Sequence, residues 1–206
     1  MALSPYHLHH VSRSDAEVLR RGKVKELEIT QILEKIPFQS QNEPLRVGVF
    51  GCAEKRFVKI HKKIFEKIFQ RPTELVTFDI SIEHLSGEEY IVQHDCTKPL
   101  PEINFDILFG HVLLKFIETE KQLSVLLNSY EALSSPGLAI HVFDAEDIET
   151  TAVKQSDGYW SVPLERWKSE LENRHIHYQE LHWEIESPGE GLPIRGIKGG
   201  ALVLIR

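Results

Sequence analysis

The sequence predicts an α/β fold in which a mostly parallel sheet is covered by helices on both faces. Short apolar segments alternate with amphipathic helical segments along the first 145 residues. Most of the apolar segments are continuous runs, which are typical of parallel strands that are buried on both sides. Near the C-terminus, two strand-like segments are joined through a turn rich in Gly and Pro, which indicates an antiparallel hairpin that completes the sheet.

The helices are predicted from apolar residues that recur with a period of 3.6. In the first helix, Ser14 or Asp15 can cap the start, and Pro37 ends the segment. The second helix carries apolar side chains on one face and lysines on the other. The expected helices are residues 14–36, 57–69, 117–134 and 163–174.

The strands are predicted from short apolar runs between turn residues. Pro136 and Gly137 are expected to form the turn into the fifth strand, and residues 187–196 are expected to form the turn of the final hairpin. The expected strands are residues 45–50, 75–80, 90–92, 105–109, 138–143, 177–186 and 201–205.

Composition narrows the class of protein. The chain has 206 residues, 41% of them hydrophobic, with 24 Lys+Arg against 31 Asp+Glu and a net charge of −7. This excludes a disordered chain, a collagen and a coiled-coil rod, and it makes nucleic acid an unlikely partner. No apolar run is long enough for a transmembrane helix or resembles a secretory signal, so no membrane association is expected. Two cysteines, Cys52 and Cys96, suit a reducing, cytoplasmic location.

Candidate ligand-binding residues follow the strands, because ligands of open α/β sheets bind outside the carboxyl ends of the strands. The most informative is Asp79, which ends the second strand. Its carboxylate can accept hydrogen bonds from both hydroxyls of a ribose, although a helix cap or a solvated loop acid explains it about as well. The strand ends are 51–53, 79–81, 94–96, 110–111 and 144.

Five ordered segments resemble the class I S-adenosylmethionine-dependent methyltransferases. They are VGVFGCAEKRF, VTFDIS, IVQHDCTKPLP, FDILFGHVLLKFI and SSPGLAIHVF. The resemblance implies a three-layer, Rossmann-like sandwich with a mostly parallel seven-stranded sheet and an antiparallel C-terminal hairpin. It also implies S-adenosylmethionine as the cofactor. Residues 1–40 would form a tail and a helix that covers the cofactor mouth, and residues 41–206 the methyltransferase-like domain.

The resemblance also implies roles for individual residues. Asp79 would bind the ribose and Asp95 the adenine, with Ile80 and Cys96 beside them. Gly51, Cys52 and Ala53 would lie under the methionine part. Gly110 and His111 would lie beside the reacting centre, where a neutral His111 can act as a general base. A histidine that merely hydrogen-bonds to its own loop is the alternative interpretation of His111.

The first motif departs from the pattern of the family. Val49 stands where an acid is usual, and Ala53 and Lys55 stand where glycines are usual, so only Gly51 remains. These changes leave open a catalytically inactive, methyltransferase-like binding or scaffold protein. The loop also lacks the GxGxxG spacing of a dinucleotide site, which makes a nicotinamide enzyme the less favoured use of the fold.

The acceptor is expected to be a small molecule. The segment after the fourth strand reads GHVL and lacks the Asn/Asp-Pro-Pro-aromatic sequence of the amide- and base-methylating branches. Asp144, Tyr159 and Trp160 are the candidate substrate-binding residues, and no metal site is expected. A nucleic-acid-methylating enzyme, suggested by the lysine-rich helix, is a further alternative.

Overall fold

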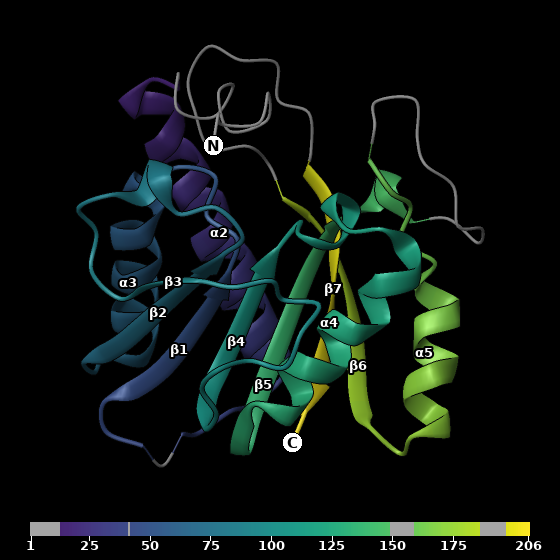
Figure 1. Cartoon of the computed structure of the whole chain (residues 1–206). Helices are drawn as coiled ribbons and strands as arrows, with labels where there is room; N and C mark the ends of the chain where they lie inside the picture. The colour runs from purple at the N-terminus through teal and green to yellow at the C-terminus, as the bar shows by residue number, and fades with distance from the viewer. Residues whose placement is uncertain (1–12, 41, 149–158, 186–196) are drawn as a thin grey trace.

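The computed structural model describes residues 13–40, 42–148, 159–185 and 197–206. They form a seven-stranded sheet in the order β3-β2-β1-β4-β5-β7-β6 (Figure 1). The first five strands pair in parallel, whereas β7 is antiparallel to both β5 and β6. The predicted α/β fold, with its mostly parallel sheet and antiparallel C-terminal hairpin, is confirmed. The strands are β1 (Leu45–Phe50), β2 (Thr73–Asp79), β3 (Ile91–Gln93), β4 (Phe105–His111), β5 (Leu133–Asp144), β6 (His177–Ile185) and β7 (Ile197–Ile205).

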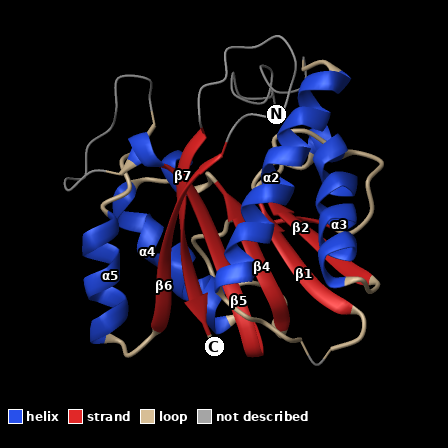
Figure 2. Cartoon of the chain, turned by 180° about the vertical axis from the view of Figure 1, so that it is seen from behind, coloured by secondary structure: helices blue, strands red, loops and turns tan. Residues whose placement is uncertain are grey.

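Helices cover both faces of this sheet. Figure 1 shows α4 in front of the sheet, and the reversed view of Figure 2 shows α2 and α3 in front of it. The described connections contain the 3-10 turns η1 (Glu83–Leu85), η2 (Leu114–Phe116) and η3 (Ala145–Asp147). The helices are α2 (Asp15–Lys35), α3 (Arg56–Phe69), α4 (Thr119–Glu131) and α5 (Leu164–Asn173).

Alternate side chains of the strands enter two separate cores. In β4, Ile107 and Phe109 join the core under α2 and α3, whereas Leu108 between them joins the core under α4 and α5. Successive side chains of a strand point to opposite faces, so a strand covered on both sides must be apolar at nearly every position. This explains why the parallel strands are continuous apolar runs in the sequence.

The predicted first helix is present and begins where the sequence indicates. The Ser14 hydroxyl accepts a hydrogen bond from the Glu17 amide at 3.2 Å, which confirms Ser14 as the N-cap. The buried side of α2, which includes Ile29 and Ile32, packs against α3 and β6. The helix is therefore an integral part of one face of the sandwich.

The expected turn at Pro136 and Gly137 was wrong, because both residues lie inside β5. The ladder between β4 and β5 shifts register between Phe105 and Ile107, and this bulge accommodates the extra residues. Gly137 exchanges two backbone hydrogen bonds with Arg206, at 3.0 and 3.1 Å. A Cβ at Gly137 would lie 2.6 Å from the Ser134 carbonyl oxygen, so this close approach requires glycine. The other expected turn, at 187–196, lies outside the described residues.

Two connections near one edge of the sheet contain no α-helix. Residues 80–90, between β2 and β3, hold only the 3-10 turn η1, and residues 94–104 lead directly from β3 to β4. The carboxyl ends of the parallel strands are therefore bordered here by short loops. Among the described helices, none combines the length and the apolar character that a bilayer crossing requires.

Candidate functional site

The loop after β1 lies at the carboxyl edge of the sheet, between the ends of β2 and β4. β1 pairs with both of these strands. Gly51 has φ of +72°, a left-handed conformation that favours glycine, and its amide donates to the Phe78 carbonyl at 2.8 Å. The chain therefore turns sharply at this edge, and Cys52 and Ala53 follow within the turn.

Asp79, at the end of β2, holds this loop in place. Its Oδ2 accepts the Cys52 amide at 2.7 Å, and its Oδ1 accepts the Ser81 amide at 3.1 Å. The residue is only 6% exposed. A carboxylate has about four lone-pair sites, so each oxygen retains an acceptor site after these two bonds. Asp79 is thus both a structural residue of the loop and a candidate acceptor for two ligand hydroxyls.

The residues after β3 form a second acidic position at the same edge. Asp95 Oδ1 accepts the Thr97 amide at 3.0 Å and the Thr97 hydroxyl at 2.7 Å. Burial raises the pKa of Asp95, but the bonds from Thr97 outweigh burial, so this pKa lies below its ordinary value. Ile80, after β2, is 67% exposed and lies in the loop that leads away from Asp79.

Both cysteines of the candidate site are poor nucleophiles. Burial raises the pKa of Cys52 to about 12, and it raises the pKa of Cys96 to about 12 as well. A thiol with such a pKa stays protonated near neutral pH, whereas the thiolate is the reactive form. Cys52 and Cys96 are therefore packing residues of the loops in which they lie.

His111 ends β4, and its side chain contacts an acid from the first helix. Its Nε2 lies 2.9 Å from Oε2 of Glu28, which is only 3% exposed. Lys25, one turn earlier on α2, places its Nζ 5.5 Å from the ring centroid of Phe57 and 5.9 Å from that of Phe109. Burial lowers the pKa of Lys25 to about 8. Charged groups of α2 therefore lie against the end of β4.

His61 lies behind this cluster, on α3. Its ring stacks on Phe57 with centroids 6.0 Å apart and meets Phe109 edge-on at 5.9 Å. Within the described part of the chain, neither ring nitrogen has a hydrogen-bond partner. Burial, and then the positive charge of Lys25, holds the pKa of His61 well below its ordinary value. His61 is therefore neutral at physiological pH.

The three predicted substrate-binding residues gather around a lysine that the sequence did not single out. Lys115 Nζ lies 2.8 Å from Asp144 and 3.1 Å from Asp147, and 5.2 Å from the ring centroid of Tyr159. The Trp160 amide donates to the Lys115 carbonyl at 2.8 Å. The acids at the end of β5 are therefore already neutralised in part by an internal cation.

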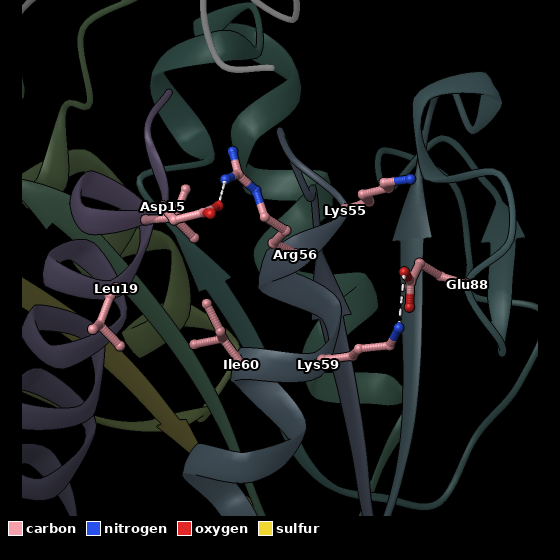
Figure 3. Close-up of a pocket in the computed structure, with 8 residues that line it drawn as sticks. Asp15, Leu19, Lys55, Arg56, Lys59, Ile60 and Glu88 are labelled. Atoms are coloured by element: carbon pink, nitrogen blue, oxygen red, sulfur yellow. Dashed lines mark hydrogen bonds and ion pairs between the residues drawn. The ribbon is translucent and has the colours of Figure 1, made fainter. Parts of the chain in front are cut away.

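A separate groove of about 420 Å³ lies between the first turns of α2 and α3 (Figure 3). Two ion pairs border it: Asp15 with Arg56, and Lys59 with Glu88 at 3.4 Å. None of the predicted site residues lines this groove, which is formed by Asp15, Val18, Leu19, Lys55, Arg56, Lys59, Ile60 and Glu88. We therefore assign the candidate site to the carboxyl edge and not to this groove.

Sequence reasoning missed Glu28 and Lys25. Glu28 lies four residues before Ile32 and four after Val24, so it falls on the buried stripe of the helix. An acid within an apolar stripe is the signal that could have identified it, because an unpaired buried carboxylate is costly. Lys115 gave no such signal, since its partners lie far along the sequence.

Solved structures with the same architecture identify the fold. No family model matches the chain, and no curated protein is similar to it in sequence. A S-adenosylmethionine-dependent methyltransferase from Archaeoglobus fulgidus superposes with a TM-score of 0.57 at 14% identity, covering 93% of this chain and 100% of that one. The N-methyltransferase NodS from Bradyrhizobium japonicum, solved with S-adenosylhomocysteine, gives 0.55 at 12% identity and covers 97% and 96%. The fold is that of the class I S-adenosylmethionine-dependent methyltransferases. A putative O-methyltransferase from Nostoc punctiforme gives 0.59 at 13% identity, covering 100% of this chain and 63% of that one.

The edge of this methyltransferase fold carries groups that suit the nucleoside part of the cofactor. Asp79 retains acceptor sites for two hydroxyls, and Asp95 supplies a second carboxylate near it. The methionine end differs, because β1 has Val49 where the family resemblance implies an acid. The charged side chains close to the end of β4 come from α2 instead, as Lys25 and Glu28.

Proposed function

We propose that this protein transfers a methyl group from S-adenosylmethionine to a small-molecule acceptor. One observation carries the proposal: the hydrogen bond from Cys52 to Asp79 joins the glycine turn to the acid of β2, at the sheet edge where β4 ends in His111. This is the arrangement expected for a nucleoside ligand that lies across the ends of β1 and β2.

Each predicted residue has a role in this proposal. Asp79 accepts the ribose hydroxyls, and Asp95 accepts the adenine amine. Bound in this way, the cofactor supplies a methyl group that its sulfonium sulfur makes electrophilic. Gly51, Cys52 and Ala53 underlie the methionine part, Ile80 and Cys96 border the nucleoside, and Gly110 lies with His111 beside the reacting centre.

The acceptor side favours a neutral molecule that must lose a proton. Asp144 is already paired with Lys115, so it is not a free acid for a cationic acceptor. Tyr159 and Trp160 supply aromatic surface next to this pair. His111 is the base: burial and the charge of Lys25 lower its pKa, so the imidazole is neutral and able to accept a proton.

Calorimetric titration with S-adenosylhomocysteine tests the proposal. We expect saturable binding, and we expect an analogue without the two ribose hydroxyls to bind more weakly by about 1–3 kcal/mol. In Asp79→Ala this difference between the two ligands should disappear. The comparison is a double-mutant cycle, so it separates loss of the ribose contact from a general effect on the loop.

The outcomes are distinct. No binding heat at millimolar ligand would overturn the proposal and leave a methyltransferase-like scaffold. If Asp79→Ala distinguishes the two ligands as well as wild type does, the assignment of Asp79 is overturned, whereas S-adenosylmethionine remains the proposed cofactor. Asp95→Ala, tested against an analogue without the adenine amine, examines the second acid in the same way.

A further inference from the structure

The contact between Glu28 and His111 joins two parts of the chain that are 83 residues apart. Glu28 lies on α2, and its side chain is almost fully buried. The side chain of His111 is 24% exposed, so part of it reaches solvent although its Nε2 faces the acid. The pair therefore connects the interior of the sandwich with its carboxyl edge.

The stability of the folded protein does not by itself explain why Glu28 and His111 form this pair. Removing a carboxylate from water costs several kcal/mol, and a buried ion pair often contributes no more than apolar residues of the same volume. Ile29 and Ile32 on the same helix belong to the apolar core, and Lys25 is a nearby cation. Buried titratable pairs at the edge of a binding site are more common where the chemistry requires them.

The geometry favours one tautomer of the ring. The nitrogen that faces the carboxyl oxygen of Glu28 is Nε2, and a hydrogen on this nitrogen satisfies the contact because a carboxylate accepts hydrogen bonds. The other nitrogen, Nδ1, has no hydrogen-bond partner among the residues that the structure describes. In the neutral ring Nδ1 is thus the acceptor.

We propose that Glu28 is a positioning residue that holds His111 with Nε2 protonated and Nδ1 free to take a proton from an acceptor hydroxyl. This inference rests on the proposed function. The first helix would then supply part of the catalytic machinery in addition to packing on the sheet.

Nδ1 of His111 takes the hydroxyl proton while an oxygen lone pair forms the bond to the methyl carbon. The electron pair of the breaking carbon–sulfur bond stays on sulfur. The imidazolium that results is stabilised by the negative charge of Glu28 and later returns its proton to water.

Other charged groups surround the ring. Lys25 on α2 opposes protonation of His111, whereas Glu28 and Asp144, at the end of β5, favour it. His61 on α3 is neutral and lies behind the ring. Burial is the largest influence, and together with Lys25 it keeps the resting ring neutral. Glu28 matters most once the ring has gained its proton.

Nitrogen-15 NMR of the full-length protein tests the inference without turnover. The shifts of Nδ1 and Nε2 report the tautomer, and the His111 signals are assigned by their loss in His111→Gln. We expect the wild-type ring to carry its hydrogen on Nε2. In Glu28→Gln the amide can also donate, so the Nδ1-protonated form should appear, and the pKa of His111 should fall by about one pH unit.

The matched control is Glu26→Gln, which makes the same change on the same helix. Glu26 pairs at the surface with Lys67, so this variant should leave the His111 signals unchanged. A wild-type ring with its hydrogen on Nδ1, or Glu28→Gln shifts identical to wild type, would overturn the inference. The wild-type spectrum decides the matter even if Glu28→Gln does not fold.

Binding of S-adenosylhomocysteine separates this inference from the proposed function. We expect Glu28→Gln to bind this ligand within about twofold of wild type, because Glu28 acts on the histidine. Normal binding with an unchanged tautomer overturns only the role of Glu28. Absent binding in the wild type overturns the proposed function, whatever the tautomer.

Discussion

The amide of Cys52 donates to the carboxylate of Asp79 across 2.7 Å, and this bond joins the turn after β1 to the end of β2. Because Asp79 also accepts the Ser81 amide, one carboxylate fixes the backbone on both sides of the strand end. A ligand that contacts Asp79 would meet a loop that is already ordered, which lowers the entropy lost on binding. The acid therefore contributes to the fold before any ligand is present.

Replacing Asp79 with Asn should destabilise the protein. The amide group keeps one acceptor oxygen but places an NH₂ opposite a backbone amide that needs an acceptor. Leaving such a buried donor unpaired costs about 1–3 kcal/mol, measured as a loss of unfolding free energy in urea. Asp95→Asn is the matched control. Only Oδ1 of Asp95 accepts from Thr97, so Asn can keep both bonds and should cost less.

Acid should destabilise the folded chain through His141. Burial lowers the pKa of His141 to about 4, compared with about 6.5 in an unfolded chain. Between these values the unfolded state binds more protons, so stability is full above about pH 6.5 and falls as the pH drops towards 4. The slope should approach about 1.4 kcal/mol per pH unit for this residue, and His61 adds to it in the same direction.

Urea unfolding at several pH values measures this slope. His141→Gln removes the titrating group, so the variant should lose less stability between pH 6.5 and pH 4 than wild type does. Parallel stability curves for the two proteins would contradict the prediction.

Gln122 should be essential to the loop that contains Ser161. Its amide nitrogen donates to the carbonyls of Leu114, Ile117 and Ser161 at 3.0–3.1 Å, and its oxygen accepts from Trp167 Nε1 at 3.1 Å. Gln122→Leu leaves the buried Trp167 Nε1 without its acceptor, whereas the carbonyls of Leu114 and Ser161 keep the Ile117 amide and the Thr119 hydroxyl as donors, so the variant should lose about 1–3 kcal/mol in urea unfolding. Gln179→Leu, at an exposed position of β6, should change stability by no more than about 0.5 kcal/mol. Equal losses in both variants would be inconsistent with the role of Gln122.

Removing the charge of Lys115 should destabilise the end of β5. Lys115→Met leaves Asp147, which is buried, without its cation, and breaking such a pair costs about 2–4 kcal/mol at neutral pH. The loss should shrink in acid, because protonation of Asp147 removes the unpaired charge. Thermal unfolding at neutral and acidic pH measures both effects. Lys62→Met, on the exposed face of α3, should show little change, and a pH-independent loss in Lys115→Met would argue against the pair.

The sequence predicted those helices and strands in which the spacing of apolar residues matches the faces that are buried in the fold. The helix that begins after Ser14 and the apolar strand β4 were expected because one buries a single stripe and the other buries both faces. The limits of β5 were not, because the Pro136–Gly137 pair usually marks a turn. Here the pairing of Gly137 with Arg206 and a bulge in the ladder outweigh that local preference.

Candidate site residues could be predicted from the sequence only where a single polar side chain directly follows an apolar strand. Asp79 and His111 were singled out as candidates because each directly follows an apolar run. Glu28 and Lys115 were missed because their roles depend on partners that only the folded chain brings near. Long-range pairs of this kind leave no local pattern, apart from the position of Glu28 within an apolar stripe.

The two ends of the sheet are protected in different ways against pairing with another chain. An exposed strand edge offers unpaired amides and carbonyls that can recruit a strand from a neighbour. At one end β3 is only three residues long, which leaves little edge to extend. At the other end β6 has nine residues and carries Glu180, His182 and Glu184 among its polar positions. Short length at one edge and charge at the other therefore disfavour edge-to-edge aggregation of this open sheet.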